Sequence, residues 1–351
     1  MKACVVFCTI RNTKAFQSYA ENFRKHNHDS DVLVVDETGD TRAHILKGLQ
    51  GFDVRFYGKK ERKEWFNQNG VNPQVVPPKT TDVIGFSLLV ANQRNYDMIV
   101  FVDDDTYPLP NCDFLGQHWK NLSNTTMRMR CSLNDWVNPH PKMFSRGYPY
   151  ALRISHKPYT IKKIHSSSVL NMGLWRNVPD LNALDYLYNG SLTAQYNYCG
   201  LLDSKSYVLG SSYMPLSRMN VAFKPKIIPA FYQFTGDEFG MGRYGDVFSG
   251  LFLMKVAKRL GDCISFGQPL CIHNKEPRDV FRDIKSECEA IKLNEKMYQV
   301  LNKIDIQGLS YADCYVCLAK ELLEHRSEFH VPEYIEYLVG KMLEWVKTVQ
   351  A

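Results

Sequence analysis

Three consecutive aspartates are the first residues whose types and spacing could do chemistry. Asp103, Asp104 and Asp105, the aspartate triplet, directly follow the apolar run "MIVFV" (98–102). Adjacent carboxylates at the end of a buried strand repel one another and raise one another's pKa unless a cation lies among them. Oxygen ligands suit Mg²⁺ or Mn²⁺, and phosphate oxygens and water usually complete the coordination of such a metal. The triplet therefore predicts a metal that holds a phosphorylated ligand; the alternative is an Asx-rich turn that caps the next element.

A histidine and a lysine near residue 273 would suit the same ligand. In "GQPLCIHNKEP" (267–277), His273 follows a short strand-like run, and its imidazole suits Mn²⁺ better than Mg²⁺. On spacing alone, a single histidine is more often structural. Lys275 could meet a phosphate group as a point charge. The segment therefore offers groups for a metal and a phosphate, and their role stays open at this point.

Two other segments place arginines in apolar or glycine-rich surroundings. "RGYPYALR" begins at Arg146 and ends at Arg153, and a partly buried arginine requires an anionic partner. Structural and functional roles are equally open for this pair. "GMGRYGD" (240–246) contains a formal Gly-x-Gly-x-x-Gly, but it does not follow a strand that opens a βαβ unit. We therefore expect a loop that carries Arg243 and Asp246 into a cleft, and not a dinucleotide-binding fold.

The elements that must position these groups alternate between strand and helix. Buried-strand runs occur at 3–10, 31–36 and 97–102, and helix-period stripes at 14–25 and 81–93. This alternation is typical of a parallel, doubly wound sheet. We expect an α/β fold, with a Rossmann-type mixed sheet flanked by helices.

Polar residues follow each of the three strand runs. Arg11 follows the first run, Asp36 ends the second, and the aspartate triplet follows the third. In open α/β sheets, ligands bind beyond the carboxyl ends of the strands. We therefore expect these residues to gather around one ligand.

The rest of the chain is expected to shape and cover this site. Residues 110–230 are rich in Pro, Asn, Gly and Tyr, which indicates a substrate-shaping region with short, mixed strands. From about residue 285 the apolar pattern becomes helical. We accordingly divide the chain into a catalytic domain (1–284) and a helical C-terminal extension packed on it (285–351).

Composition narrows the class of protein. The chain has 351 residues and a formal net charge of only +6, and the mixed-sign run "KKERKEW" (59–65) is typical of a solvated face. It lacks the block of interleaved aromatics and arginines that would indicate nucleic-acid binding. The ten cysteines fit reduced thiols, and "CYVC" (314–317) lies in a helix-period run. With neither a signal peptide nor an apolar run of transmembrane length, we expect a cytoplasmic protein; a peripheral place at the Golgi is the alternative in a eukaryote.

Several segments together resemble the reversibly glycosylated polypeptides, the family of the plant UDP-arabinopyranose mutases, which have a GT-A-like glycosyltransferase fold. They occur in family order and cover nearly the whole chain: "TIRN" (9–12), "VLVVD" (32–36), "VDDDTYP" (102–108), "RGYPYALR" (146–153), "GLWRNVPD" (173–180), "MNVAF" (219–223), "GRYGDVFSG" (242–250) and "PLCIHNK" (269–275). The resemblance implies a GT-A-like domain that binds a UDP-sugar and a divalent metal, Mn²⁺ or Mg²⁺.

The resemblance also implies roles at the nucleotide and the metal. The aspartate triplet matches the family's metal- and nucleotide-sugar-binding aspartates, with Asp103 and Asp105 as the expected metal ligands and Asp104 beside the nucleotide sugar. His273 matches the late histidine that completes the metal coordination in GT-A enzymes, which reverses its structural interpretation. Asp36 is expected to meet the uridine, and Arg11 the diphosphate.

Further roles concern the sugar. Arg146 matches the arginine that family members glycosylate reversibly on themselves, and Arg153 matches a second arginine tied to activity. Asp246 falls where a family carboxylate faces the sugar. A protonated arginine is a poor nucleophile, so electrostatic anchoring is the more conservative role for Arg146.

The chain departs from the family pattern near the sugar. The family's usual Arg-Tyr-Asp-Asp ends in Gly245-Asp246 here, so that one carboxylate is missing. The segment "SHKPYTIKKIHSSS" (155–168) is an insertion, Met172 replaces the family's histidine, and "LNA" (181–183) replaces its Tyr-Asp-Ala. A UDP-type donor is therefore better supported than arabinose as the sugar.

We expect a metal-dependent UDP-sugar enzyme that interconverts pyranose and furanose forms, as the mutases do, with self-glycosylation on arginine as an implied property. One alternative is a glycosyltransferase that passes the sugar to a separate acceptor, which the altered sugar end favours. The other is a non-catalytic subunit that binds a UDP-sugar. The sequence leaves open the sugar, the metal and whether the chain forms a homo-oligomer.

Overall fold

The sheet at the centre of the molecule is mixed, as expected. The computed structural model describes residues 1–39, 42–76, 81–124, 126–140, 142–155, 159–195 and 205–351. Within these stretches, eleven strands pair in the order β3-β2-β1-β4-β10-β8-β11-β9-β6-β7, with β5 paired to β11. The strands are β1 (Ala3–Thr9), β2 (Ser30–Asp36), β3 (Val54–Tyr57), β4 (Met98–Asp103), β5 (Thr106–Pro108), β6 (Thr126–Cys131), β7 (Thr160–His165), β8 (Ser168–Asn177), β9 (Ser206–Leu209), β10 (Asn220–Phe223) and β11 (Cys263–His273).

The N-terminal half of the sheet is the parallel part that the alternation predicts. β3, β2, β1 and β4 run parallel, and the apolar side chains of β1, β2 and β4 are buried on both faces, as in doubly wound folds. The register sets Thr9 opposite Asp36, and Cys8 opposite Asp103. The carboxyl ends of β1, β2 and β4 therefore meet at one edge.

The second half of the sheet changes direction. β10 is antiparallel to both β4 and β8, so that β8 runs in the same direction as β4. β11 runs parallel to β8, and its register shifts around Gly267 and Pro269. Its carboxyl end, at His273, pairs with β5, the strand that follows the aspartate triplet. Two segments distant in sequence are thus joined at the edge where the polar residues lie.

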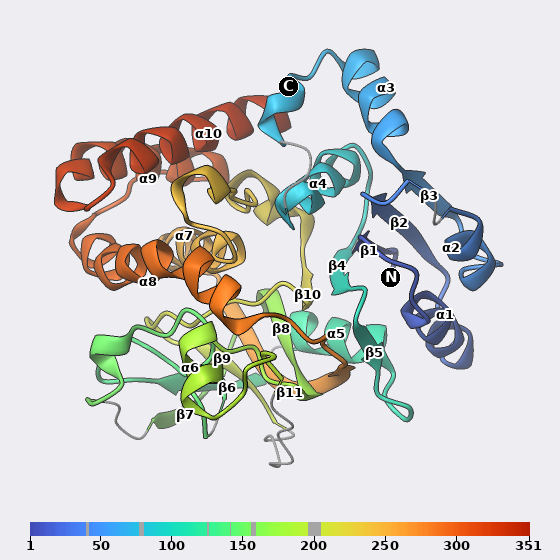
Figure 1. Cartoon of the computed structure of the whole chain (residues 1–351), viewed down its shortest axis with the longest axis horizontal. Helices are drawn as coiled ribbons and strands as arrows, with labels where there is room; N and C mark the ends of the chain where they lie inside the picture. Colours follow the sequence, from blue (N-terminus) through green and yellow to red (C-terminus); the bar gives the residue numbers. More distant parts are fainter. Residues whose placement is uncertain (40–41, 77–80, 125, 141, 156–158, 196–204) are drawn as a thin grey trace.

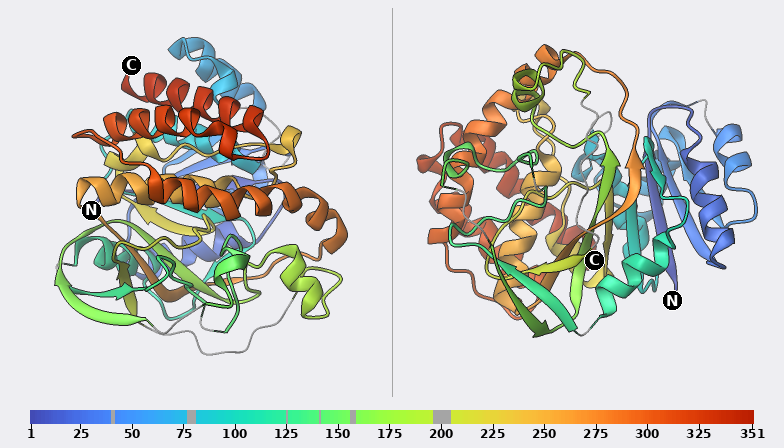
Figure 2. Two further views of the ribbon diagram at one scale, coloured as in Figure 1. Left: turned by 90° about the vertical axis from the view of Figure 1, so that its left-hand side faces the viewer. Right: turned by 90° about the horizontal axis from the view of Figure 1, so that it is seen from below.

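Helices flank the sheet on both sides. Figures 1 and 2 show α8, α9 and α10 together on one side of the molecule, and α1, α2 and α3 on the opposite side. The helices are α1 (Ala15–Lys25), α2 (Arg42–Gly48), α3 (Lys59–Asn69), α4 (Gly85–Asn92), α5 (Phe114–Ser123), α6 (Ala183–Tyr188), α7 (Gly245–Leu260), α8 (Val280–Lys303), α9 (Tyr311–Glu324) and α10 (Pro332–Gln350), with a short 3₁₀ turn, η2 (Thr81–Ile84), before α4. The α/β class and the helical C-terminal region are confirmed.

The C-terminal helices share one apolar core with the sheet. Leu293 of α8, Leu318 of α9 and Leu338 of α10 are fully buried in the same cluster as the strands. Among the described helices, none is long and apolar enough to cross a bilayer. Cys314 and Cys317 both lie in α9 as free thiols. Of the inserted segment, residues 156–158 lie outside the described residues, while 160–165 form β7 and pair with β6.

Candidate functional site

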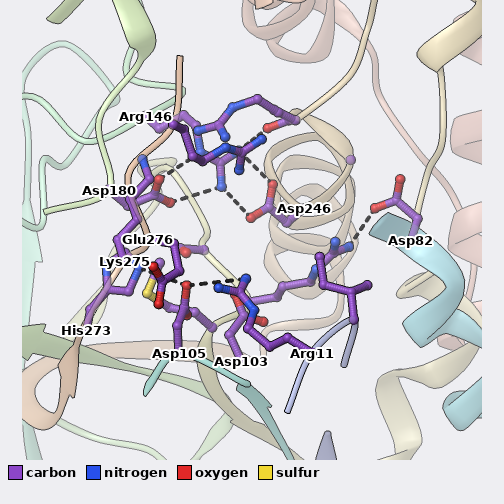
Figure 3. Close-up of a pocket in the computed structure, with 17 residues that line it drawn as sticks. Arg11, Asp82, Asp103, Asp105, Arg146, Asp180, Asp246, His273, Lys275 and Glu276 are labelled. Atoms are coloured by element: carbon purple, nitrogen blue, oxygen red, sulfur yellow. Dashed lines mark hydrogen bonds and ion pairs between the residues drawn. The ribbon is translucent and has the colours of Figure 1, made fainter. Parts of the chain in front are cut away.

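A polar cavity of about 490 Å³ lies beyond the carboxyl ends of β1, β4 and β11, at the N-terminus of α7 (Figure 3). Charged side chains of both signs line it. The cations are Arg11, Arg146, Arg218, Arg243, Lys275 and Arg278, and the anions are Asp82, Asp103, Asp105, Asp180, Asp246 and Glu276. His273 completes this set of ionisable lining residues. The expected position of the ligand and the position of the cavity coincide.

Arg11 and Asp104 fix one wall of the cavity. The Thr9 hydroxyl and the Ile10 backbone N–H donate to Asp104 Oδ2 at 2.8 and 3.2 Å, and Arg11 Nε lies 3.1 Å from Asp104 Oδ1. Asp104 therefore ties the end of β1 to the end of β4 and orients Arg11. Its own carboxylate is 5% exposed and points toward β1. Arg11 lies within 4.0 Å of Asp105 and does line the cavity.

Asp103, Asp105 and His273 form what we call the aspartate end of the cavity. Burial and the neighbouring Asp105 raise the pKa of Asp103 to about 7. Burial opposes ionisation of Asp105, but His273 overcomes it and lowers the pKa of Asp105 below its ordinary value. Two carboxylates held this close, one of them reluctant to ionise, favour an added cation.

The tautomer of His273 suits a metal ligand. Its Nδ1 lies 2.7 Å from the backbone oxygen of Val178, which can only accept, so Nδ1 carries the proton. Nε2 faces Asp105 Oδ2 at 3.8 Å and is the ring nitrogen that a neutral imidazole would offer to a metal. A backbone partner that fixes the imidazole in this way is typical of metal-bound histidines. Within the described residues, no three Asp, Glu, His or Cys side chains converge on one point as a closed metal site. The donors therefore fit a Mn²⁺ or Mg²⁺ ion whose coordination is completed by phosphate oxygens and water.

At the opposite end, Arg146 lies between Asp180 and Asp246, and we call these three residues the arginine clamp. Its Nε and NH2 donate to Asp180 at 3.0 and 2.9 Å, and its NH1 and NH2 donate to Asp246 at 2.9 and 2.7 Å. NH1 also donates to the backbone oxygen of Arg243. Arg146 is 8% exposed, and each of its five N–H groups has an acceptor among the described residues.

Arg146 and Asp180 stabilise each other's charged forms in the clamp. Burial alone would lower the pKa of Arg146, but Asp180 and Asp246 overcome this and raise it well above its ordinary value. In turn, burial opposes ionisation of Asp180, and Arg146 nevertheless lowers the pKa of Asp180 well below the usual range. The guanidinium therefore stays protonated, and Asp180 stays ionised at the rim of the cavity.

Helix α8 supports the loops that carry the clamp. Glu287 accepts from Arg243 Nε at 2.6 Å and from the Ala183 backbone N–H at 2.7 Å. Further along α8, Asn294 donates to the backbone oxygen of Gly147 at 2.8 Å, and Glu295 accepts from the backbone N–H groups of residues 150 and 151. A single helix thus holds the segments on both sides of Arg146.

Lys275 is a buried cation that points into the cavity beside Asp180 and Glu276 (Figure 3). It is 9% exposed, and Nζ has no hydrogen-bond partner within the part of the chain that the structure describes. Burial lowers its pKa to about 8. A buried ammonium without an acceptor is costly, which indicates that an anion belongs there.

Besides Asp104, two further predicted residues lie away from the cavity lining. Asp36, at the end of β2, is fully buried, and its carboxylate accepts from the Thr38 and Gly39 backbone N–H groups at 3.0 and 3.1 Å. Arg153 forms a bidentate ion pair with Asp185 at 2.6 and 2.9 Å, stacks on the Tyr150 ring at 3.6 Å, and lines a separate cavity. The roles assigned to both residues stay predictions.

Several lining residues were not singled out from the sequence, and Asp180, Arg218 and Asp82 are three of them. Asp180 ends the segment "GLWRNVPD", so its motif was visible but its partner was not. Arg218 precedes β10 and pairs with Asp82 of η2 at 2.6 Å. No local pattern marks Asp82 or Arg218, because each acquires its position through a contact between distant segments.

The chain is similar to several known proteins. A family model described as reversibly glycosylated polypeptide matches residues 2–351. UDP-arabinopyranose mutase 1 of Arabidopsis thaliana is 24% identical over 361 residues, covering 98% of this chain and 90% of that protein. UDP-arabinopyranose mutase 3 of the same plant is 25% identical, and a probable UDP-arabinopyranose mutase 1 of Pisum sativum is 24% identical, each covering 98% of this chain and 89% of its own length. A crystal structure of glucosyl-3-phosphoglycerate synthase from Mycobacterium tuberculosis, in complex with Mn²⁺, UDP and phosphoglyceric acid, is similar with a TM-score of 0.44 and 14% identity, covering 88% of this chain and 80% of that one.

Proposed function

The chain belongs to the reversibly glycosylated polypeptide family, and from this premise we propose that it is a metal-dependent UDP-sugar enzyme that interconverts the pyranose and furanose forms of the sugar. One observation carries the proposal. The aspartate end and the arginine clamp line the same cavity, of about 490 Å³. The first suits a metal and a diphosphate, and the second supplies carboxylates for a neutral, hydroxyl-rich group.

The aspartate end would hold the nucleotide. Asp103, Asp105 and His273 would bind the divalent metal, which neutralises the charge that grows on the diphosphate as it leaves the sugar. Arg11, oriented by Asp104, approaches the same diphosphate from β1. Lys275 supplies a further buried positive charge in the cavity, and its Nζ would donate to the diphosphate, an acceptor that it lacks among the described residues.

The arginine clamp would hold the sugar. Asp180 and Asp246 face the cavity as carboxylates and would stabilise the positive charge that develops at the anomeric carbon. Arg146 anchors both. Nucleophilic attack by Arg146 would require the loss of a proton and of hydrogen bonds to two ionised partners, which its raised pKa opposes. We therefore assign Arg146 an anchoring role, and self-glycosylation at this position would require the clamp to open first.

UDP and the sugar would both stay in the cavity between cleavage of the bond that joins them and its re-formation. The bond between the anomeric carbon and the phosphate oxygen breaks, and its electron pair leaves with UDP. In between, another hydroxyl oxygen of the sugar would bond to the anomeric carbon, the bond from the original ring oxygen to that carbon would break, and the hydroxyl proton would pass to the original ring oxygen. The same phosphate oxygen of UDP then attacks the anomeric carbon again. Retention of UDP gives this return step a high effective concentration. Arg11 and Lys275, which line the same cavity, are groups of this chain that would retain it.

A glycosyltransferase is the second candidate function. The specific observation in its favour is the altered sugar end, where Gly245 replaces a carboxylate of the family pattern and β7 is built from an inserted segment. In this case, the sugar would pass to a separate acceptor and UDP would be released. The site residues and their charges would serve both reactions.

Incubation with UDP-arabinopyranose and Mn²⁺, followed by chromatographic separation of the products, distinguishes these functions. Formation of UDP-arabinofuranose supports the mutase. Free UDP that accumulates only when an acceptor is added supports the transferase. If none of several UDP-sugars is converted although UDP binds tightly, the enzyme proposal fails and a nucleotide-sugar-binding subunit is favoured instead.

A further inference from the structure

The backbone at Gly245 leaves no room for a side chain. A Cβ atom there would lie 2.2 Å from the backbone oxygen of Phe234 and 2.6 Å from Oδ1 of Asp82. Both distances are shorter than any real Cβ contact. The position of the carboxylate that is missing from the family pattern is thus bordered by the carboxylate of Asp82, which comes from a segment more than 150 residues away in sequence.

Asp82 is held in the cavity wall by an arginine. Arg218 NH1 donates to Asp82 Oδ1 at 2.6 Å, and both residues line the cavity. Asp82 is 8% exposed and lies on the opposite side of the cavity from Lys275 (Figure 3). Burial raises the pKa of Asp82 to about 6 even though Arg218 acts in the opposite direction. Burial disfavours the charged form of this carboxylate, and a group perturbed in this way in the wall of a cavity indicates that it binds the ligand.

We propose that Asp82 positions the sugar: its carboxylate, oriented by Arg218, accepts hydrogen bonds from hydroxyl groups of the UDP-linked sugar, and Gly245 provides the space that it needs. The inference rests on the proposed function, since it takes a UDP-sugar as the ligand. In this arrangement Asp82 replaces, from η2, the carboxylate that the family pattern places at the start of α7. Three carboxylates then surround the sugar, those of Asp82, Asp180 and Asp246, and each is paired with an arginine.

The arrangement gives Asp82 a role that differs from that of the aspartate end. Carboxylates are strong acceptors for sugar hydroxyls, and a hydrogen bond to a charged group contributes about 1.5–3 kcal/mol, or about 10-fold or more in affinity. UDP alone has no sugar to bind at this position. Loss of Asp82 should therefore weaken the binding of UDP-sugars and leave the binding of UDP unchanged.

Calorimetric titration in the presence of Mn²⁺ tests this difference. UDP, UDP-arabinopyranose, UDP-xylose and UDP-glucose are titrated into the wild type, Asp82→Asn and Asp82→Ala. The control is Asp31→Asn, which also breaks an aspartate–arginine pair, that with Arg55, but outside the cavity. We expect both Asp82 variants to bind the preferred UDP-sugar about 10-fold more weakly, with the affinity for UDP and that of the control within about two-fold of wild type.

A second arm uses analogues of the preferred UDP-sugar that lack one hydroxyl group in turn. If Asp82 accepts from a particular hydroxyl, the analogue without it binds the wild type more weakly, and Asp82→Ala causes no further loss with that analogue. A merely structural ion pair between Asp82 and Arg218 would reduce the binding of all analogues alike. The first half of this arm requires only the wild-type protein, so it does not depend on the folding of a variant.

The two hypotheses fail in different ways. If the wild type binds UDP-sugars no better than UDP and converts none of them, the proposed function fails. If the wild type binds and converts a UDP-sugar, but the Asp82 variants change the affinities for UDP and UDP-sugar equally or not at all, the assignment of Asp82 is overturned and the proposed function stands.

Discussion

Replacement of Arg146 by alanine tests the arginine clamp most directly. The substitution removes five hydrogen bonds, counted over the described residues, and leaves Asp180 and Asp246 as facing carboxylates that are each less than 10% exposed. Removal of one partner from a buried ion pair costs about 3–5 kcal/mol. Both carboxylates share one cation and border a cavity that water can enter. We therefore expect Arg146→Ala to lower the free energy of unfolding by about 3–5 kcal/mol in total, and not by this amount for each carboxylate.

The free energy of unfolding, measured by urea denaturation at pH 7.5, gives the magnitude. Arg55→Ala is the matched control, because Arg55 lies 3.6 and 3.4 Å from Asp31 and Asp53 in a more exposed pair, for which we expect about 1 kcal/mol or less. In parallel, calorimetry should find UDP affinity in Arg146→Ala close to wild type while turnover of the UDP-sugar is lost, since the aspartate end is intact.

A compensated variant separates the charge argument from simple damage to the fold. In Arg146→Met combined with Asp180→Asn and Asp246→Asn, no unpaired charge is left in the clamp, so that most of the lost stability should return although turnover stays absent. The reasoning is refuted if Arg146→Ala lowers the free energy of unfolding by less than about 1 kcal/mol, or if the triple variant is no more stable than the single one.

Four further outcomes follow from individual residues. Asp105→Ala should abolish the Mn²⁺-dependent part of UDP binding, and EDTA should have the same effect on the wild type; an unchanged affinity for UDP would remove Asp105 from the metal site. Lys275→Met should raise the free energy of unfolding at pH 7 by about 1–3 kcal/mol, because it deletes a buried charge without an acceptor among the described residues. The same variant should bind the UDP-sugar more weakly. The prediction is contradicted if urea denaturation and calorimetry show that stability and UDP-sugar affinity both rise or both fall. Asp82 has a folded pKa of about 6 against an ordinary 3.8, so the folded state binds its proton more tightly, and wild-type stability should fall by about 3 kcal/mol relative to Asp82→Asn as pH rises from 3 to 7; parallel stability curves would refute the shift. Gly245→Ala should fold poorly or lose more than about 2 kcal/mol, since its Cβ would meet the backbone oxygen of Phe234; a melting temperature equal to wild type would show that the backbone yields freely.

The sequence predicts the fold best where local patterns determine it. The apolar runs before Arg11 and the aspartate triplet correctly predict β1 and β4 as strands of one parallel sheet, because buried parallel strands are encoded by short continuous segments. It follows that their polar ends lie at one edge. The reversal of direction at β10 was not predicted, since strand order depends on contacts between segments far apart in the chain.

In the site, too, local motifs predict the residues, whereas the pairings between them depend on long-range contacts. The motifs that carry Arg146, Asp246 and His273 were visible, and the structure brings all three residues into one cavity. What the motifs do not encode is which carboxylate meets which arginine. Asp180 is 34 residues from Arg146 in sequence, and Asp82 is 136 residues from Arg218. Both pairings arise only when the sheet and α7 have been assembled.

The place of α8 in the chain order bears on how the protein is made. A ribosome adds the strands that carry Arg11 and the aspartate triplet first, and the loop with Arg146 soon afterwards, whereas Glu287 and Asn294 come much later. Since segments fold as they emerge, the parallel strands can associate while the loop still awaits its helical support. A chain terminated before residue 280 would carry its aspartates, yet the loops of the clamp would lack the helix that holds them. Premature translation products should therefore have no sugar chemistry of their own.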